Sequence, residues 1–341
     1  MAQTQISDVV VPSVFAPYVQ LLSTELSLLV RTGVVATSPA LDSFLSGGGT
    51  FIDMPHWNDL SDTEANVSGD DRSDLLNPVV TSSGKDAIPQ KIDKVQTVAI
   101  RNNRNQNWST MDLSAQLAGS DPMSAIANRV AAYWVRQDQL TLNSTIKGLV
   151  AGTATLVNDI AEGAEGTPAA GNLFSADALL DTLQLMGDHK QNLSAIAVHS
   201  AVHTKMQKLN LIDFVSNSDA NVGFGTYMGK SLIVDDGLAI TSDGTNDEYF
   251  TIAFGANAFA QGTGSPRVAA EVSRQALAGN GGGQEVLTSR REFVLHPNGF
   301  TVKAAVAAGQ SPTNTELEAS DAYSLSVARK LVPFAVLKTN G

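Results

Sequence analysis

The chain has 341 residues, enough for one large domain or two modest ones, and its net charge of −12 disfavours tight binding to nucleic-acid phosphates. It contains no cysteine, which excludes disulfides, thiolate metal sites and a cysteine nucleophile. Only 16% of the residues are charged, so we expect much of the surface to be covered by other subunits.

Targeting and membrane segments are not indicated by the sequence. The N-terminus lacks a basic region followed by an apolar core, and no apolar run approaches the roughly 18 residues that span a bilayer. We therefore expect a chain made in the cytoplasm that does not cross a membrane.

Residues 1–49 are predicted to form an N-terminal arm. Apolar residues at helical spacing favour one or two amphipathic helical pieces that end at Gly33, and a short turn of helix is expected after Pro39. Gly47-Gly48-Gly49 is interpreted as a flexible joint. The alternative, a phosphate-binding loop, requires a strand before and a helix after, whereas the strand-like segment 50–54 follows the triplet.

Residues 50–112 are predicted to form an extended loop with its root strands. The stretch 53–104 is acidic in its first half (Asp53, Asp59, Asp62, Glu64, Asp70, Asp71, Asp74) and basic in its second (Lys85, Lys91, Lys94, Arg101, Arg104). It has too few large apolar side chains to pack a core, and structureless loops of this length are uncommon unless functional. We expect a two-stranded arm that lies across a neighbouring molecule; a solvated loop is the alternative.

A long helix is predicted from Ser120 to Val150, within the region 113–172. Ser120-Asp121-Pro122 supplies a cap residue and a proline suited to the first turn. Apolar residues then recur on one helical face at Met123, Ile126, Ala127, Val130 and Trp134. At about 1.5 Å per residue the helix reaches roughly 40 Å. A long rod between a compact domain and extended arms indicates a building block rather than an enzyme.

The region 173–284 is predicted to form an α/β domain. Ser175 and Ser200 are expected to cap two helices, the first ending at Gly187. The expected strands are Leu193–Val198, Leu232–Val234, Glu248–Phe254 and Val268–Val272.

The region 285–341 is predicted to return to the first domain and end in a strand. A hairpin is expected between Glu292–Leu295 and Phe300–Val302, joined by the turn His296-Pro297-Asn298-Gly299. The last strand is expected at Phe334–Leu337.

No residue is assigned a catalytic, cofactor-binding or metal-binding role. Gly229-Lys230-Ser231 resembles the end of a phosphate loop, but the position that requires glycine is Phe224, so we interpret it as an ordinary loop. His199 and His203 have the spacing of zinc ligands, but Ser200 replaces the glutamate that zinc hydrolases carry. A surface or boundary pair is therefore favoured.

The other polar clusters also give no reactive site. The acids Asp235, Asp236, Asp243, Asp247 and Glu248 do not fit a calcium loop and are interpreted as a solvated turn. His56, His189 and His296 are placed in loops without companion ligands. Trp57, Trp108 and Trp134 are isolated rather than interleaved with basic residues. We expect no enzyme activity and no cofactor.

Several segments, in order along the chain, resemble the major capsid protein of tailed bacteriophages and prophages. They are Ile6–Pro12 with Val14–Tyr18, Ser46–Gly49 with Met54–Asp59, Leu117–Met123, Val198–Ser200 with Lys205–Leu209, and Pro312–Leu317 with Leu337–Gly341. Each segment is short, and their order from end to end carries the resemblance.

The resemblance implies the α+β fold of tailed-phage and herpesvirus capsid proteins. That fold has an N-terminal arm (1–49), an extended two-stranded loop (50–112), a peripheral domain with a long spine helix (113–172, rejoined by 285–341) and an axial α/β domain (173–284). Some members cross-link a lysine of the extended loop to a neighbour's asparagine; Lys85, Lys91 and Lys94 are candidates by location alone, and no cross-link is predicted.

The resemblance also implies a structural function in the virion. Copies self-assemble into homo-hexamers and homo-pentamers of an icosahedral shell that encloses double-stranded DNA without sequence-specific binding. Portal, scaffold, protease or decoration proteins are the expected partners, with assembly in the host bacterial cytoplasm and no membrane. Two alternatives stay open: the shell protein of an encapsulin-type bacterial nanocompartment, and a soluble α/β enzyme.

Overall fold

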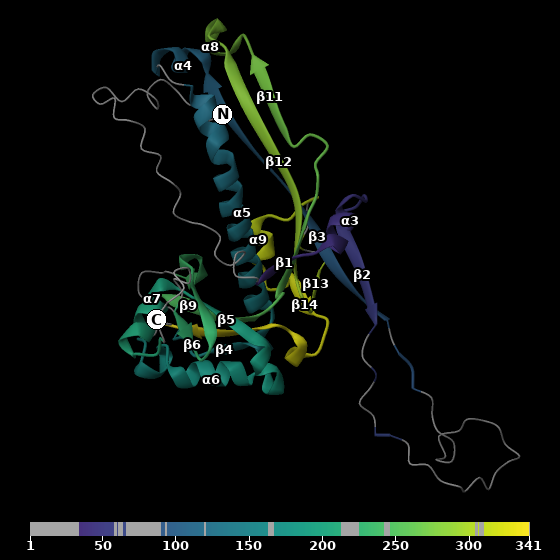
Figure 1. Cartoon of the computed structure of the whole chain (residues 1–341), viewed down its shortest axis with the longest axis vertical. Coiled ribbons are helices and arrows are strands. Elements are labelled where there is room, and N and C mark those ends of the chain that lie inside the picture. Colours follow the sequence, from purple (N-terminus) through teal and green to yellow (C-terminus); the bar gives the residue numbers. More distant parts are fainter. Residues whose placement is uncertain are drawn as a thin grey trace, which may run out of the picture. The chain divides into compact units, whose positions relative to one another are not determined.

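The computed structural model describes residues 34–57, 60, 64–65, 90–92, 94–118, 121–162, 167–212, 225–241, 246–303, 306 and 310–340 (Figure 1). The chain divides into two compact units: Asp53–Thr97 forms one, and the remainder on either side of it forms the other. The predicted helical pieces before Gly33 and most charged residues of the extended loop lie outside the described residues.

The predicted long helix is confirmed as α5, Pro122–Gly152, with 31 residues. Its cap is Asp121, whose carboxylate accepts a hydrogen bond from the backbone N–H of Met123 at 3.0 Å. The two halves differ in burial. Most side chains from Thr141 to Leu149 are buried, whereas most of those from Pro122 to Ala132 are half-buried or exposed.

A six-stranded sheet carries the longest strands of the chain. Its order is β1 (Val35–Thr37), β10 (Phe259–Thr263), β12 (Gln284–Pro297), β3 (Lys94–Met111) and β2 (Phe51–Trp57), and β11 (Ala270–Gln275) pairs with β12 beside β10. β12 and β3 are antiparallel from Arg101 opposite Val294 to Met111 opposite Gln284. α3 (Pro39–Leu45), the expected short helix after Pro39, packs against β10.

A seven-stranded sheet lies near the C-terminal end of α5 (Figure 1). Its order is β4 (Val157–Asp159), β15 (Phe334–Thr339), β9 (Glu248–Gly255), β5 (Leu193–Val198), β7 (Lys230–Val234) and β6 (Thr226–Tyr227), and β8 (Ala239–Thr241) pairs with β9. The C-terminal strand β15 is fully buried over its first four residues and lies between parallel β4 and antiparallel β9. α6 (Ala176–Gln184) packs against β15.

The remaining elements are short. α4 (Asp112–Ala118) follows β3, α7 (Ser200–Lys208) follows β5, α8 (Ala278–Gly281) follows β11, and α9 (Asn314–Leu317) packs on α5. Short 3-10 helices occupy Ala154–Leu156, Ala170–Asn172, Gly187–Asn192, Asp236–Leu238 and Arg329–Leu331.

Three predictions, of a strand partner, a strand position and a helix cap, are wrong. The strand β13 (Phe300–Val302) does not form a hairpin with β12; it pairs with β14 (Tyr323–Leu325) in a separate two-stranded sheet. The predicted turn is present, with Gly299 at φ 88°, but the strand that follows it pairs with β14 instead of β12. The predicted strand 268–272 is shifted to β11, and it lies in the six-stranded sheet. The cap of α7 is His199 and not Ser200.

Candidate functional site

The glycine–lysine segment is a hairpin turn. Met228 and Gly229 both have positive φ, at 52° and 73°, and join β6 to β7 with Tyr227 opposite Lys230. This is a two-residue turn between strands, and no helix follows it. The Lys230 ammonium donates to the backbone oxygen of Leu193, and burial lowers its pKa. The lysine is therefore used to join two strands of the sheet.

His199 holds the start of α7. Its Nδ1 accepts a hydrogen bond from the N–H of Ala201 at 3.1 Å, its Nε2 lies 3.7 Å from Asp236, and its ring contacts that of Tyr249. The carboxylate of Asp236 accepts from Ser200, and these hydrogen bonds lower its pKa. His199 thus has a structural position at the boundary of strand and helix.

The other histidines are not gathered into a site. His56 lies in β2 and His296 in β12, so their placement in loops is wrong; His189 lies in a 3-10 helix. Burial lowers the pKa of His296 to about 4, which keeps its ring neutral at pH 7. Among the described residues, no three His, Asp or Glu side chains stand together as metal ligands.

The acids between β7 and β9 have separate roles. Asp235 is buried and accepts from Gln139 of α5 at 2.8 Å and from the N–H of Gly237 at 2.9 Å. Asp247 accepts from the hydroxyl of Tyr249 at 3.1 Å. Asp243 lies outside the described residues. Of these acids, Asp235 is the one that connects α5 to the seven-stranded sheet.

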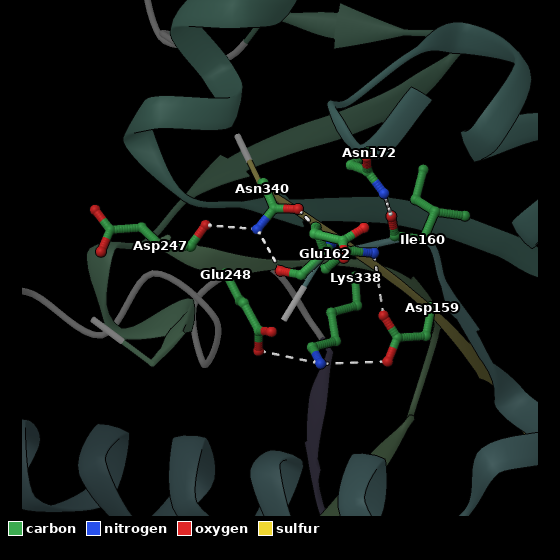
Figure 2. Close-up of polar contacts among 9 residues, drawn as sticks. Asp159, Ile160, Glu162, Asn172, Asp247, Glu248, Lys338 and Asn340 are labelled. Atoms are coloured by element: carbon green, nitrogen blue, oxygen red, sulfur yellow. Dashed lines mark hydrogen bonds and ion pairs between the residues drawn. The ribbon is translucent and has the colours of Figure 1, made fainter. Parts of the chain in front are cut away.

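A polar cluster fixes the C-terminal strand (Figure 2). Lys338 of β15 lies 3.2 Å from Asp159 of β4 and 3.0 Å from Glu248 of β9. Burial by itself lowers the pKa of Lys338, but its hydrogen bonds and ion pairs with both carboxylates outweigh that effect and raise it. Two residues on, the side chain of Asn340 bonds the backbone of Glu162 at 2.6 and 3.1 Å. The end of the chain thus joins β4 to β9.

Two arginines of β3 hold two different helices to the six-stranded sheet. Arg101 pairs with Glu292 at 3.1 Å and donates to backbone oxygens at the end of α3. Arg104, which lies opposite Arg291 in the register, donates to Asn314 of α9 at 3.0 Å. Because side chains alternate along a strand, Arg101 and Arg104 project from opposite faces, so the sheet is held on both.

Arg291 and two aromatic residues connect the sheet to α5. Arg291 pairs with Asp138 at 2.9 Å, and the indole N–H of Trp134 donates to Ser289 at 2.9 Å. The ring of Tyr133 meets that of Trp108 edge-on, with centroids 5.2 Å apart. Burial raises the pKa of Asp138 to about 6, against the opposing effect of Arg291. These contacts fix one face of α5 along β12 and β3.

The root of the extended loop carries one shallow hollow. It is lined by Asp53, Pro55, Lys94 and Gln96. Nearby, the hydroxyl of Thr97 donates to the backbone oxygen of Met54 at 3.0 Å and ties the two root strands together. The hollow brings together one carboxylate, one ammonium and no nucleophile, which suits contact with another polar surface better than catalysis.

The described side chains therefore build a scaffold. Arginine, tryptophan and aspartate side chains join long strands to helices, and no helix among these residues has both the length and the apolar character to cross a bilayer. Sequence reasoning missed Arg291, Asp138 and Lys338. The only sequence signal for them is a charge inside an otherwise apolar strand or helix.

A long helix lying on extended antiparallel strands, next to a separate α/β sheet, is a fold that this chain shares with phage capsid proteins. The fold matches the capsid of Ralstonia phage GP4 with a TM-score of 0.55 and 9% identity, over 97% of this chain and 98% of that one. It matches a chain of the capsid of cyanophage Pam1 with a TM-score of 0.54 and 9% identity, over 100% and 99%.

The chain belongs to the Gp13-like family, described as major capsid protein 13-like, whose model matches residues 73–330. The major capsid protein of Bacillus phage SPP1 is 39% identical over 323 residues, which cover 93% of this chain and 92% of the relative. The expected family, fold class and function are confirmed: the chain is a phage major capsid protein, a structural part of the virion and not an enzyme.

Proposed function

We propose that copies of this chain assemble into homo-hexamers and homo-pentamers that tile an icosahedral shell around double-stranded phage DNA. The observation that carries the proposal is the identity with the SPP1 major capsid protein along nearly the whole of both chains. Closed symmetry multiplies modest contact energies by the number of copies, so many weak surfaces suffice.

In this proposal the arm (1–49) and the extended loop (50–112) reach adjacent subunits. The peripheral parts (113–172 and 285–341) and the axial domain (173–284) form the body of each subunit. Two features of the sheets bear on these boundaries. β10 and β11 fall in the range 173–284 but pair in the six-stranded sheet, and β15 falls in 285–341 but pairs in the seven-stranded sheet. The proposed boundaries are continuous ranges of the sequence, whereas each sheet takes strands from more than one of these ranges.

The DNA is confined in this proposal and not gripped. The chain carries 34 acidic against 22 basic residues, and this net charge of −12 disfavours tight, sequence-independent binding to DNA phosphates. Portal and possibly scaffold or decoration proteins are the further partners, and assembly takes place in the host bacterial cytoplasm. The encapsulin-type alternative shares the fold and differs in enclosing a cargo enzyme.

Negative-stain microscopy of the purified chain tests self-assembly. Closed shells or rings of five and six subunits are expected, and a monodisperse monomer at high concentration would contradict the proposal. Particles isolated from infected cells then distinguish the cargo: nuclease-protected DNA supports the phage shell, and a protein cargo supports the nanocompartment.

Deletion of residues 60–90 tests the role of the extended loop. We expect the remaining chain to keep its circular dichroism and cooperative unfolding, because the core formed by the described residues uses none from this range. Particles should fail to form. Normal particles from the deleted chain would refute the bridging role of the loop while leaving self-assembly intact.

A further inference from the structure

The sequence contains three asparagine–glycine pairs, Asn280-Gly281, Asn298-Gly299 and Asn340-Gly341. In such a pair the asparagine side chain cyclises readily onto the backbone, because glycine leaves the following peptide nitrogen unshielded and lets the chain adopt the required geometry. The reaction also requires a side-chain amide that is free to move. The structure holds the three pairs to different degrees.

Asn280 lies in a glycine-rich turn. Residues 276–283 join β11 to β12, and four of the five residues 279–283 are glycine. Asn280 has φ 56° and ψ 43°, and its neighbours Gly279 and Gly281 also have positive φ, at 64° and 88°. Glycine has no side chain to oppose rotation, so the backbone at Asn280 can leave this conformation at little cost.

The two groups that would react are weakly held. The side chain of Asn280 is exposed and has no hydrogen-bond partner among the described residues. The N–H of Gly281 donates to the carbonyl of Leu277 at 3.4 Å, compared with 3.2 and 3.0 Å for the N–H bonds of Gly282 and Gly283 in the same turn. A Cβ atom added at Gly281 would have no neighbour within 4 Å, so this peptide is open on that side.

The other two asparagine–glycine pairs are held by hydrogen bonds. The side-chain nitrogen of Asn298 donates to the backbone oxygen of Asn257, and its backbone N–H donates to Ala258 at 3.0 Å. The amide of Asn340 is bound at both ends, since its oxygen accepts from the N–H of Glu162 at 2.6 Å and its nitrogen donates to the carbonyl of Glu162 at 3.1 Å (Figure 2). A bound amide reacts only after these bonds open.

We propose that Asn280 is a site of spontaneous deamidation. The backbone nitrogen of Gly281 attacks Cγ of Asn280, the bond from Cγ to the amide nitrogen breaks, and that nitrogen leaves as ammonia with the proton from Gly281. Water then opens the five-membered imide at either carbonyl, which gives aspartate or isoaspartate at residue 280. The reaction needs no enzyme, metal or second copy, so the proposal does not rest on the proposed function.

The product differs from the natural chain in charge and in backbone. One NH2 group is exchanged for one OH group, which ionises at neutral pH and adds one negative charge to the net −12. Isoaspartate also inserts one more carbon into the main chain of the turn between β11 and β12, whereas aspartate leaves the main chain unchanged. A stored population of the chain therefore becomes heterogeneous in charge with time.

Peptide mapping by mass spectrometry tests the proposal on the full natural chain. One sample is kept folded at mildly alkaline pH, and a second is unfolded in guanidinium chloride at the same pH and temperature. Digestion in heavy-oxygen water marks any reaction that occurs during sample preparation. Only the local sequence acts in the unfolded chain, so all three pairs should react there.

In the folded chain we expect Asn280 to react at least about tenfold faster than Asn298 and Asn340, because these two react only through local opening. Asn280 should also keep most of the rate that it has in the unfolded chain. A folded-state rate at Asn280 as slow as at the two held asparagines would overturn the proposal. Equal and fast reaction at all three would overturn it as well, since the hydrogen bonds would then give no protection.

Native isoelectric focusing gives a second measurement. The natural chain should develop a more acidic band that migrates with the variant Asn280→Asp. Asn280→Gln should develop that band much more slowly, because the longer side chain must close a six-membered ring. Asn128→Gln, at an exposed asparagine of α5 that is not followed by glycine, is the matched control and should age like the natural chain. An acidic band that grows equally fast in Asn280→Gln would contradict the proposal.

Discussion

The Cα of Gly148 on α5 lies against the backbone carbonyl of Leu317 on α9. A Cβ atom at residue 148 would stand 1.9 Å from that oxygen, far inside any real contact. The close approach seats α9 on the helix, and only glycine permits it. The same contact recurs one turn later, where a Cβ at Gly152 would stand 2.6 Å from the oxygen of Ser320.

Gly148→Ala should therefore destabilise the chain. Because the obstacle is backbone and cannot rotate away, we expect a loss of about 2 kcal/mol or more in urea unfolding of the unassembled chain. Gly171→Ala is the control, since no atom lies within 4 Å of its added Cβ, and it should change stability by less than about 0.5 kcal/mol. Equal effects of the two variants would show that α9 moves freely on α5.

Asp138 should give the chain a distinctive pH dependence. The folded chain holds this proton with a pKa of about 6, and the unfolded chain with the ordinary value near 3.8. Tighter proton binding by the folded state means that the stabilisation is complete below about pH 4 and is lost as the pH rises through 6. Ionised Asp138 is therefore unfavourable at neutral pH, despite Arg291.

Asp138→Asn should remove that part of the pH dependence. At pH 7.5 we expect the variant to be more stable than the natural chain by on the order of 1–3 kcal/mol, with the difference vanishing toward pH 4. Denaturant unfolding at several pH values measures it. A variant less stable than the natural chain at pH 7.5 would show that the attraction of Arg291 exceeds the cost of burial.

Lys338→Met should destabilise the C-terminal strand, because it leaves the largely buried carboxylate of Glu248 facing Asp159 without the ammonium. We expect a loss of about 1–3 kcal/mol at pH 7. Since the pKa of Lys338 is raised, its stabilisation is present below pH 10.5 and disappears only at higher pH.

The double variant Lys338→Met/Glu248→Gln isolates the electrostatic part of that loss. It should recover some of the stability, because the uncompensated charge is gone. Lys190→Met, at an exposed lysine, is the control and should be nearly neutral. A double variant as unstable as the single one would assign the loss to packing.

Met228→Asn should stabilise the β6–β7 hairpin. Met228 has φ 52°, a left-handed conformation that asparagine adopts more readily than methionine, and its side chain is 46% exposed. We expect a gain of about 0.5–1 kcal/mol in thermal or urea unfolding. Gly229→Ala, at φ 73°, should have the opposite sign. Loss of stability in Met228→Asn would indicate an unseen contact of the methionine.

Local signals predicted the elements of this chain better than their partners. Asp121-Pro122 and the apolar stripe of α5 located the helix within two residues at each end, because capping and periodicity act within one element. The turn at Asn298-Gly299 was also found. Its outgoing strand, however, pairs with β14, and a local turn signal contains no information about a partner that lies 21 to 25 residues further along the chain.

The cap of α7 was predicted from residue type, and that prediction was one residue off. Serine is the more usual cap, but α7 begins at Ser200, so the capping position falls on His199. Its ring nitrogen Nδ1 accepts the hydrogen bond from the N–H of Ala201. The orientation of α4 was not predicted either. Ser114 is buried while Leu113 and Leu117 are exposed, and helical spacing alone does not say which face of a helix points inward.

The unequal burial of the two halves of α5 predicts a gradient of amide hydrogen exchange along a single helix. In the separate chain, amides near Leu142 and Ile146 should exchange only through global unfolding, while those near Asn128 should exchange through local fraying. If neighbouring subunits cover the exposed half in the shell, assembly slows exchange there and leaves the buried half unchanged. The helix would then report shell formation from within its own backbone.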